Sequence, residues 1–262
     1  MQRRIARLPV EVLEGEGAKF TSPMVLVHGL WDEVAVWRPF MGYLAHRGWR
    51  CFAVDWRRAA ESPRPGTFAA LADDLRDACV ALEAPPVVVG HDLGALLALH
   101  AAAVARAVAA LSPLPLPALH RAGPAHLARA GTVLDRLRGR PLTAPAVHSA
   151  FASAGGEAVR ESPSLLDELR RMPVLPDPVP AGTPALLLCG DADPITPLEA
   201  AQRLAAHAHA ELRVVPGATH ALHHEPGWDR RVSDLHRWLI QSLGEPLLAR
   251  LEESEEDSEA ED

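Results

Sequence analysis

One aspartate in this sequence stands where a nucleophile would be placed. The segment VVVGHDLGALLALHAA runs from an apolar, strand-like stretch through Gly90, Asp92 and Gly94 into an Ala/Leu-rich, helix-like stretch. This is the pattern G-x-nucleophile-x-G at a strand-to-helix turn, whose small flanking residues let the central side chain stand above a sheet. A carboxylate is already ionised near neutral pH and can attack an electrophilic carbon directly. Taken alone, Asp92 could equally be a buried or helix-capping aspartate.

Two later segments supply an acid and a base in the order that such a nucleophile requires. Gly190-Asp191-Ala192-Asp193 follows one apolar run, and Gly217-Ala218-Thr219-His220 follows the last one. A histidine oriented by a carboxylate acts as a general base. Upstream, His28-Gly29-Leu30 ends another apolar run, where a backbone N–H can turn toward a developing oxyanion.

The elements that must position these residues are short apolar runs bounded by glycine or proline. Such runs, separated by helical segments, predict an α/β fold with a mostly parallel sheet covered on both faces. The predicted strands are residues 24–29, 50–56, 87–90, 185–190 and 211–215.

Start signals and apolar spacing predict the helices. Thr67 precedes a helix whose leucines recur at helical spacing, and a last helix begins at about Trp228. Thr196 is expected to cap a further helix, with Pro197 at its first position. The most apolar stretch, residues 95–111, is interpreted as one buried helix that is too short to span a bilayer.

Residues 112–183 interrupt the alternation and contain no convincing strand. Proline-rich segments bracket this region, and helix-like pieces such as SPSLLDELRRM lie between them. We therefore predict a helical cap at 112–183, inserted into a core formed by 1–111 and 184–250. Residues 251–262, LEESEEDSEAED, are expected to form a disordered acidic tail.

The distribution of charge narrows the expected partners. The tail holds eight of the 34 carboxylates and no base, so the other 26 acids balance the 26 basic side chains. A neutral body has no positive patch for nucleic acid or for an anionic membrane surface, so a small apolar substrate is the expected partner. No oligomeric state is assigned by the sequence.

The cysteines and the first residues bear on the expected location. The N-terminal residues lack the apolar core of a secretory signal. The three cysteines, Cys51, Cys79 and Cys189, have no paired spacing and are expected to be reduced core residues of a cytoplasmic protein.

Five ordered motifs together resemble the α/β-hydrolase superfamily over essentially the whole chain apart from the tail. They are VHGLWD, VDWRRAAES, GHDLG, GDADPITP and GATHALHHEP. The resemblance implies an α/β-hydrolase fold with a helical cap and no cofactor. It also implies that Asp92 is the nucleophile, Asp193 the orienting acid and His220 the base, and that the amides of Leu30 and Leu93 form the oxyanion site.

Neighbouring residues compete for some of these roles. Asp191 is an alternative orienting acid, but the family spacing G-x-x-D favours Asp193. His223 and His224 are alternative bases, but the pattern G-x-x-H followed by a glutamate selects His220. The pairs His207/His209 and His223/His224 have no obvious third ligand, so no metal site is predicted.

The GHD elbow is similar to those of haloalkane dehalogenases, haloacetate dehalogenases and soluble epoxide hydrolases. The chain lacks the cap tyrosines of epoxide hydrolases, having only Tyr43, and has Leu93 where haloalkane dehalogenases commonly have a tryptophan. It also lacks the arginine that haloacetate dehalogenases place near the elbow. Alternative leaving-group donors are Trp31, next to the oxyanion turn, and three histidines of the predicted cap, His120, His126 and His148.

These features predict a hydrolase that forms an alkyl ester on Asp92 with a small apolar epoxide or organohalide, which water activated by His220 then cleaves. Two alternatives remain. One is an esterase, lactonase or lyase in which Asp92 acts as a base or binds water. The other is a non-catalytic binding or scaffold protein built on the same fold.

Overall fold

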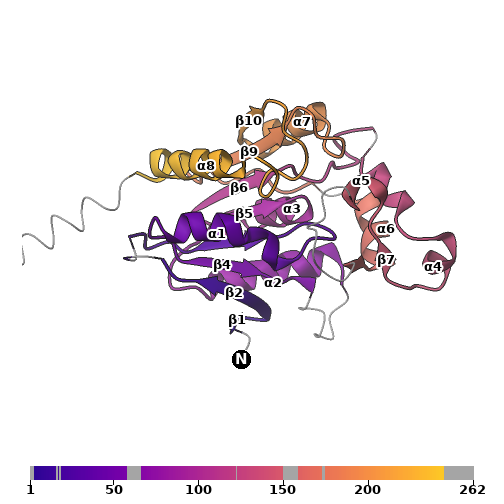
Figure 1. The fold of residues 1–262 in the computed structure, drawn as a ribbon, viewed down its shortest axis with the longest axis horizontal. Coiled ribbons are helices and arrows are strands. Elements are labelled where there is room, and N and C mark those ends of the chain that lie inside the picture. Colours follow the sequence, from indigo (N-terminus) through magenta and orange to yellow (C-terminus); the bar gives the residue numbers. More distant parts are fainter. Residues whose placement is uncertain are drawn as a thin grey trace, which may run out of the picture.

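An eight-stranded sheet runs through the centre of the molecule (Figure 1). The computed structural model describes residues 3–15, 17, 19–57, 66–121, 123–149, 159–172 and 175–244. Across the sheet, the strands are β1 (Arg3–Ile5), β2 (Leu8–Leu13), β4 (Cys51–Val54), β3 (Met24–Val27), β5 (Val87–His91), β6 (Ala107–Leu111), β9 (Ala185–Gly190) and β10 (Glu211–Val215).

The pairing of the strands gathers their carboxyl ends at one edge. The pairs β1/β2 and β2/β4 are antiparallel, and every later pair of neighbours is parallel. In register, Val27 of β3 lies beside Gly90 of β5, and His91 lies beside Leu111 of β6. The loops that follow β3, β5 and β9 therefore start at the same edge of the sheet.

Helices bury both faces of the sheet. One face packs against α2 (Phe68–Val80), α3 (Leu93–His100) and α7 (Leu198–Ala208), and the other against α1 (Arg38–Ala45) and α8 (Trp228–Leu243). Along β3, Val25 and Val27 join the first core, whereas Met24 and Leu26 join the second. This alternation explains why the central strands are apolar throughout rather than at every second residue.

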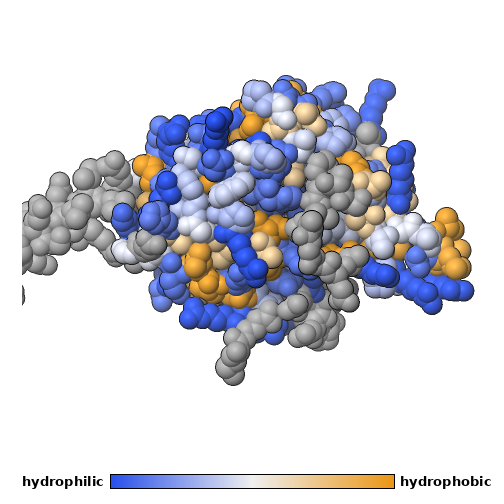
Figure 2. Space-filling view, viewed as in Figure 1, coloured by the Kyte–Doolittle hydropathy of each residue, from blue (hydrophilic) through white to orange (hydrophobic). Residues whose placement is uncertain are grey.

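The cap region contains both helices and a small sheet. Its elements lie together beside the main body (Figure 1): η4 (Ala125–Arg129), α4 (Val133–Leu137), β7 (Leu142–Thr143), α5 (Ala146–Ser149), β8 (Arg160–Glu161) and α6 (Pro163–Arg171). The prediction of a cap without strands was wrong, because β7 and β8 form an antiparallel pair. Apolar side chains are exposed at its far end, over α4 (Figure 2).

The predicted strands are confirmed with small shifts in their ends, as are the helices starting after Thr67 and at Trp228. Thr67 accepts a hydrogen bond from the Ala70 amide and so caps α2. The three cysteines are buried and free. No helix among the described residues is long and apolar enough to cross a membrane. The predicted tail, 251–262, lies outside the described residues.

Two predictions about local structure were wrong, and two strands were missed. Residues 95–111 do not form one helix, because α3 ends at His100, the short helix η3 (Ala102–Val104) follows, and β6 starts at Ala107. The alanines of β6 favour a helix by propensity, but burial between β5 and β9 overrides that preference. β1 and β2 were also missed. Thr196 does not cap α7, since its hydroxyl donates to the Pro113 carbonyl and Pro197 is the N-cap residue.

Candidate active site

Asp92 sits in a strained turn between β5 and α3. Its φ of 52° and ψ of −114° lie in a region that non-glycine residues rarely occupy. The glycines on either side allow this geometry, because a Cβ at Gly90 would collide with the carbonyl of Gly94, and a Cβ at Gly94 would collide with that of Val27. A Cβ at Gly29 would lie 2.8 Å from the Cβ of Asp92. The sequence pattern thus has a steric cause, close backbone packing around the carboxylate.

The two carboxylate oxygens of Asp92 have different surroundings. The Leu30 amide donates to Oδ2 at 2.9 Å. Oδ1 accepts no hydrogen bond from the described residues, although it is buried. The nearest ionisable group to Oδ1 is His220, whose Nε2 lies 3.6 Å away. Oδ2 is therefore held by the backbone, whereas Oδ1 faces His220.

His220 is oriented by Asp193. Its Nδ1 lies 2.9 Å from Oδ2 of Asp193, and Oδ1 of Asp193 accepts the amides of Ile195 at 2.7 Å and Thr196 at 2.9 Å. The carboxylate is thus fixed by the turn that follows β9 and presents its other oxygen to the imidazole. Burial opposes the charged form of Asp193, but His220 and these two amides lower its pKa below the ordinary value.

The ionisation states of Asp92 and His220 depend on each other. Burial tends to raise the pKa of Asp92, but His148 and His220 outweigh it and hold that pKa well below its ordinary value of 3.8. Burial tends to lower the pKa of His220, yet Asp193 and Asp92 together raise it to about 10. The resting site therefore holds two carboxylates and an imidazolium between them.

The cap contributes His148, on α5, to this site. Its Nε2 lies 3.9 Å from Oδ2 of Asp92, and its ring centroid lies 4.6 Å from that of Trp31 and 4.8 Å from that of His126. Neither ring nitrogen of His148 makes a hydrogen bond to the described residues, and the side chain is buried. Burial lowers the pKa of His126 to about 3, so that neighbour is neutral.

Comparison with known proteins identifies the family of this chain. A profile of the alpha/beta hydrolase family matches residues 24–233, most of the chain. The chain belongs to the alpha/beta hydrolase family. A search of curated protein sequences found no match for this hydrolase.

Solved structures share the hydrolase's fold at low identity. MGS-MChE2, an alpha/beta hydrolase enzyme from a sediment metagenome of the Mar Chica lagoon in Morocco, is 16% identical, with 92% of this chain and 98% of that chain covered and a TM-score of 0.60. A monoacylglycerol lipase from Paleococcus ferrophilus is 20% identical, with 89% and 99% covered and a TM-score of 0.62. E-2-(acetamidomethylene)succinate hydrolase is 20% identical, with 91% and 98% covered and a TM-score of 0.63. At these low sequence identities, the structural similarity shows a shared fold and nothing about activity.

Trp31 of the hydrolase, considered above as a leaving-group donor, forms hydrogen bonds to the cap instead. The indole N–H of Trp31 donates to the Leu142 carbonyl at 3.2 Å, and its backbone N–H donates to Glu161 at 2.8 Å. The indole donor is thus engaged with the cap and does not serve a leaving group in this structure. Leu93 is buried at the start of α3, directly after Asp92. The oxyanion role of its amide stays a prediction.

The other residues that the sequence analysis considered for catalytic roles have different surroundings. Asp191 is exposed, and its Oδ1 accepts the Gly217 amide at 2.6 Å. Tyr43 lies on α1, where the Arg47 guanidinium carbon stands 3.4 Å from the centre of its ring. Of the cap histidines, His148 is the one within ion-pair distance of Asp92 among the described residues.

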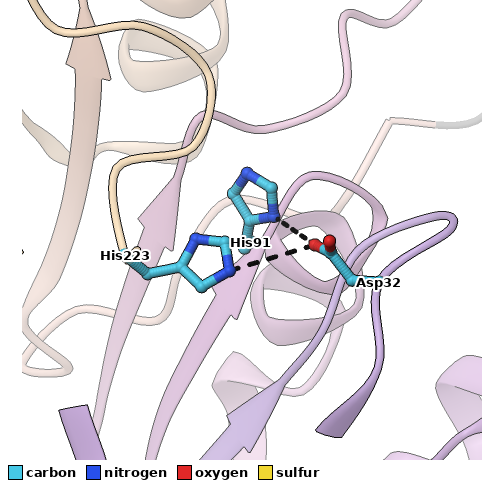
Figure 3. A group of neighbouring side chains, drawn as sticks. All are labelled: Asp32, His91 and His223. Atoms are coloured by element: carbon cyan, nitrogen blue, oxygen red, sulfur yellow. Dashed lines mark hydrogen bonds and ion pairs between the residues drawn. The ribbon is translucent and has the colours of Figure 1, made fainter. Parts of the chain in front are cut away.

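Sequence reasoning missed a second group of residues beside the triad. Asp32, His91 and His223 come together behind the site (Figure 3), and His91 Nε2 lies 2.9 Å from the backbone carbonyl of His220. His91 belongs to the motif GHDLG at the elbow, and Asp32 belongs to VHGLWD at the oxyanion turn. These positions next to the predicted site were the one sequence signal that could have indicated the group.

Proposed function

We propose that this hydrolase opens small apolar epoxides through a covalent ester on Asp92. The observation that carries the proposal is the arrangement around Asp92: one oxygen held by Leu30, the other facing His220, and His148 across the carboxylate from the cap. A nucleophile, a base and an acid are thereby supplied by separate residues.

In the first step, Oδ1 of Asp92 attacks a ring carbon of the epoxide. The carbon–oxygen bond breaks, its electron pair goes to the ring oxygen, and His148 in its imidazolium form gives that oxygen a proton and becomes a neutral imidazole. The product of this step is a hydroxyalkyl ester of Asp92. Burial of the site favours the attack, because a carboxylate with no hydrogen bond on Oδ1 has little solvent to shed.

Formation of the ester prepares His220 for the second step. Asp92 loses its negative charge, and with it one of the two carboxylates that raise the pKa of His220 to about 10. The pKa of His220 then falls, so that the imidazolium can release its proton to solvent and, as a neutral imidazole, accept one from the attacking water. The histidine therefore changes from a counter-ion to a base when the ester forms.

In the second step, the activated water attacks Cγ of Asp92. The electron pair of the carbonyl moves onto Oδ2, where the Leu30 amide, 2.9 Å away, stabilises it. Collapse of the intermediate expels the diol with Oδ1, and His220 returns the water's proton to it. The remaining carboxyl proton restores His148, and a proton from solvent restores the imidazolium of His220. One epoxide and one water thus give one diol, and the water oxygen enters Asp92.

The choice of an epoxide over an organohalide follows from the donors. Opening an epoxide creates an alkoxide that needs a proton, whereas a departing halide needs only hydrogen-bond donors. His148 carries transferable protons, and the indole of Trp31 already donates to Leu142. The site is thus better equipped to protonate oxygen than to cradle a halide.

The test is trapping of the intermediate. Purified protein and its Asp92→Asn and His220→Gln variants would be incubated with styrene oxide, and separately with 1-bromobutane, and examined by mass spectrometry. We expect turnover of the epoxide by the parent protein, none with Asp92→Asn, and an added mass on Asp92 with His220→Gln. A single turnover in ¹⁸O-water would place the label in Asp92.

Other outcomes would assign the site differently. Faster conversion of 1-bromobutane would make the hydrolase a dehalogenase with the same nucleophile. Hydrolysis of aryl esters that survives Asp92→Asn would favour an esterase, and binding without conversion would favour a ligand-binding role.

A further inference from the structure

The second Asp–His cluster has no part in the proposed reaction. Asp32 lies in the loop after β3, His91 at the end of β5, and His223 in the loop that leads to α8. All three side chains are buried, and Figure 3 shows both imidazoles directed at the carboxylate. Three segments far apart in the sequence thus converge on a single point inside the protein.

Both imidazoles of this cluster face the same carboxylate oxygen. From Oδ2 of Asp32, Nδ1 of His91 lies 3.0 Å away and Nε2 of His223 lies 3.9 Å away. The three donor atoms all lie within 4.8 Å of one another. In a tetrahedral zinc site with bonds of about 2.0 Å, neighbouring ligand atoms stand about 3.3 Å apart, between the two distances observed.

His223 is the member that most needs a further partner. Its side chain is fully buried, and neither ring nitrogen makes a hydrogen bond to the described residues. Its Nε2 is directed at Oδ2 of Asp32, 3.9 Å away, which is too far for a hydrogen bond. A buried imidazole with no partner is rare, and a metal ion accepts a lone pair of such a ring.

His91 is held in the way that metal-bound histidines usually are. Its Nε2 lies 2.9 Å from the His220 carbonyl, which can accept only an N–H. Nδ1 lies 3.0 Å from Oδ2 of Asp32, at hydrogen-bond distance, and a bound metal ion would take the place of the proton between these two atoms. A carbonyl bound to the far nitrogen is the usual device that fixes the tautomer and the ring of a metal ligand.

We propose that Asp32 Oδ2, His91 Nδ1 and His223 Nε2 bind one divalent transition-metal ion of the zinc class. Two imidazoles and one carboxylate suit zinc better than magnesium or calcium, which take oxygen ligands. The ion would join the loops after β3, β5 and β10 and, through His91, fix the backbone of His220. Its role is structural, and no step of the reaction passes through it.

The catalytic cluster is the competing site, since Asp92, His148 and His220 also lie within 4.8 Å of one another. There the imidazoles face different oxygens: His220 lies 3.6 Å from Oδ1 and His148 lies 3.9 Å from Oδ2. Oδ2 also accepts the Leu30 amide. That geometry presents a carboxylate to a substrate, whereas the second cluster converges on one point.

The experiment measures metal binding by the full chain. Protein stripped with a chelator would be titrated with Co²⁺, whose visible absorption reports tetrahedral nitrogen and oxygen ligands, and zinc would be measured by mass spectrometry after reloading. We expect one ion per chain and a higher thermal unfolding temperature with Zn²⁺. Asp32→Asn and His223→Gln should each weaken Co²⁺ binding more than about 10-fold.

Matched variants separate this site from other histidines. His148→Gln should keep Co²⁺ binding, and so should the double variant His207→Gln/His209→Gln. Circular dichroism would verify folding, and the titration of the unaltered chain decides the matter if a variant fails to fold. An unaltered chain that takes up no Co²⁺ or Zn²⁺, or one whose binding depends on His148 but not on His223, overturns the proposal.

Discussion

The two Asp–His clusters are built from the same residue types and differ in how the carboxylate is presented. Asp92 and Asp32 are both buried, and each is faced by two imidazoles. Around Asp92 the imidazoles face different oxygens, and the backbone is strained at a φ of 52°. Around Asp32 they face one oxygen. The arrangement of donors, rather than composition, decides whether a buried carboxylate suits a reacting carbon or an ion.

The two clusters also differ in what surrounds them. The cap reaches Asp92 through His148, so the reactive carboxylate lies where core and cap meet. Asp32 and its histidines belong to loops of the core, and the ring of His223 packs 4.6 Å from that of Trp37. A site between two parts of the fold can open to a substrate, while one packed within the core is better suited to hold a permanent ligand.

The largest difference between the two clusters is expected when each aspartate, Asp92 or Asp32, is replaced by asparagine. Asp92→Asn should lower epoxide turnover by about 10⁴-fold or more, because the amide cannot form the ester, and should leave Co²⁺ binding unchanged. Asp32→Asn should weaken Co²⁺ binding more than about 10-fold. Steady-state kinetics and metal titration on both variants check this. Loss of Co²⁺ binding in Asp92→Asn would show that the two clusters act as one functional unit.

A smaller effect is expected from His220→Gln, which should slow hydrolysis of the ester by about 10²- to 10⁴-fold because water loses its base. The ester should then accumulate and be visible by rapid-quench mass spectrometry. His224→Gln, at a neighbouring position in the same loop, is the control and should accumulate none. Equal accumulation in the two variants would remove the distinction between the triad histidine and its neighbours.

His148→Gln tests the acid assigned to the cap. Glutamine keeps a donor but transfers no proton, so epoxide opening should fall by about 10²-fold while alkylation by 1-bromobutane changes much less. His120→Gln, elsewhere in the cap, is the matched control. Pre-steady-state measurement of the two substrates checks this. An equal loss for both substrates would show that His148 positions the substrate rather than supplying a proton.

The smallest of the expected effects is on the pH dependence of the free energy of unfolding. The pKa of His220, raised to about 10 in the folded chain, exceeds its ordinary 6.5, so its contribution to the free energy of unfolding is complete below pH 6.5. It declines as the pH rises toward 10. The lowered pKa of Asp193 acts in the opposite sense, and its contribution is lost as the pH falls below 3.8.

Denaturant unfolding of the chelated, metal-free chain at several pH values measures these slopes. His220→Gln should flatten the decline between pH 6.5 and 10, and Asp193→Asn should flatten the acid limb. A slope that is identical in His220→Gln and the unaltered chain would mean that His220 is not held as an imidazolium.

Local patterns predicted five of the eight strands and singled out Asp92, Asp193 and His220, which the structure brings together. Glycines next to Asp92 and the turns before Asp193 and His220 have local steric and spacing signatures, which the structure explains by close backbone contacts and turn hydrogen bonds. β6 was missed because its alanines have no strand signature of their own. Only tertiary burial makes that segment a strand.

Contacts between distant segments could not be predicted in the same way. Asp32, His91 and His223 occupy three separate motifs, and each taken alone reads as an ordinary polar residue near a turn. His148 was one of three candidate histidines in a cap with no periodic pattern, and its selection depends on how α5 packs over the elbow. The metal-binding cluster and the contact of His148 with Asp92 form only when the chain folds, so spacing along the sequence does not reveal them.

The contacts of Trp31 set conditions on the timing of catalysis. The residue beside Leu30 is tied to the cap at Leu142 and at Glu161, and Arg57 of the core also pairs with Glu161. A cap that lifts to admit substrate must break these bonds and so loosens the turn that carries the Leu30 amide. In the proposed mechanism, ester cleavage is then confined to the closed state, and release of the diol waits for reopening. The turnover number is therefore expected to report the lifetime of these tethers as much as the chemistry at Asp92.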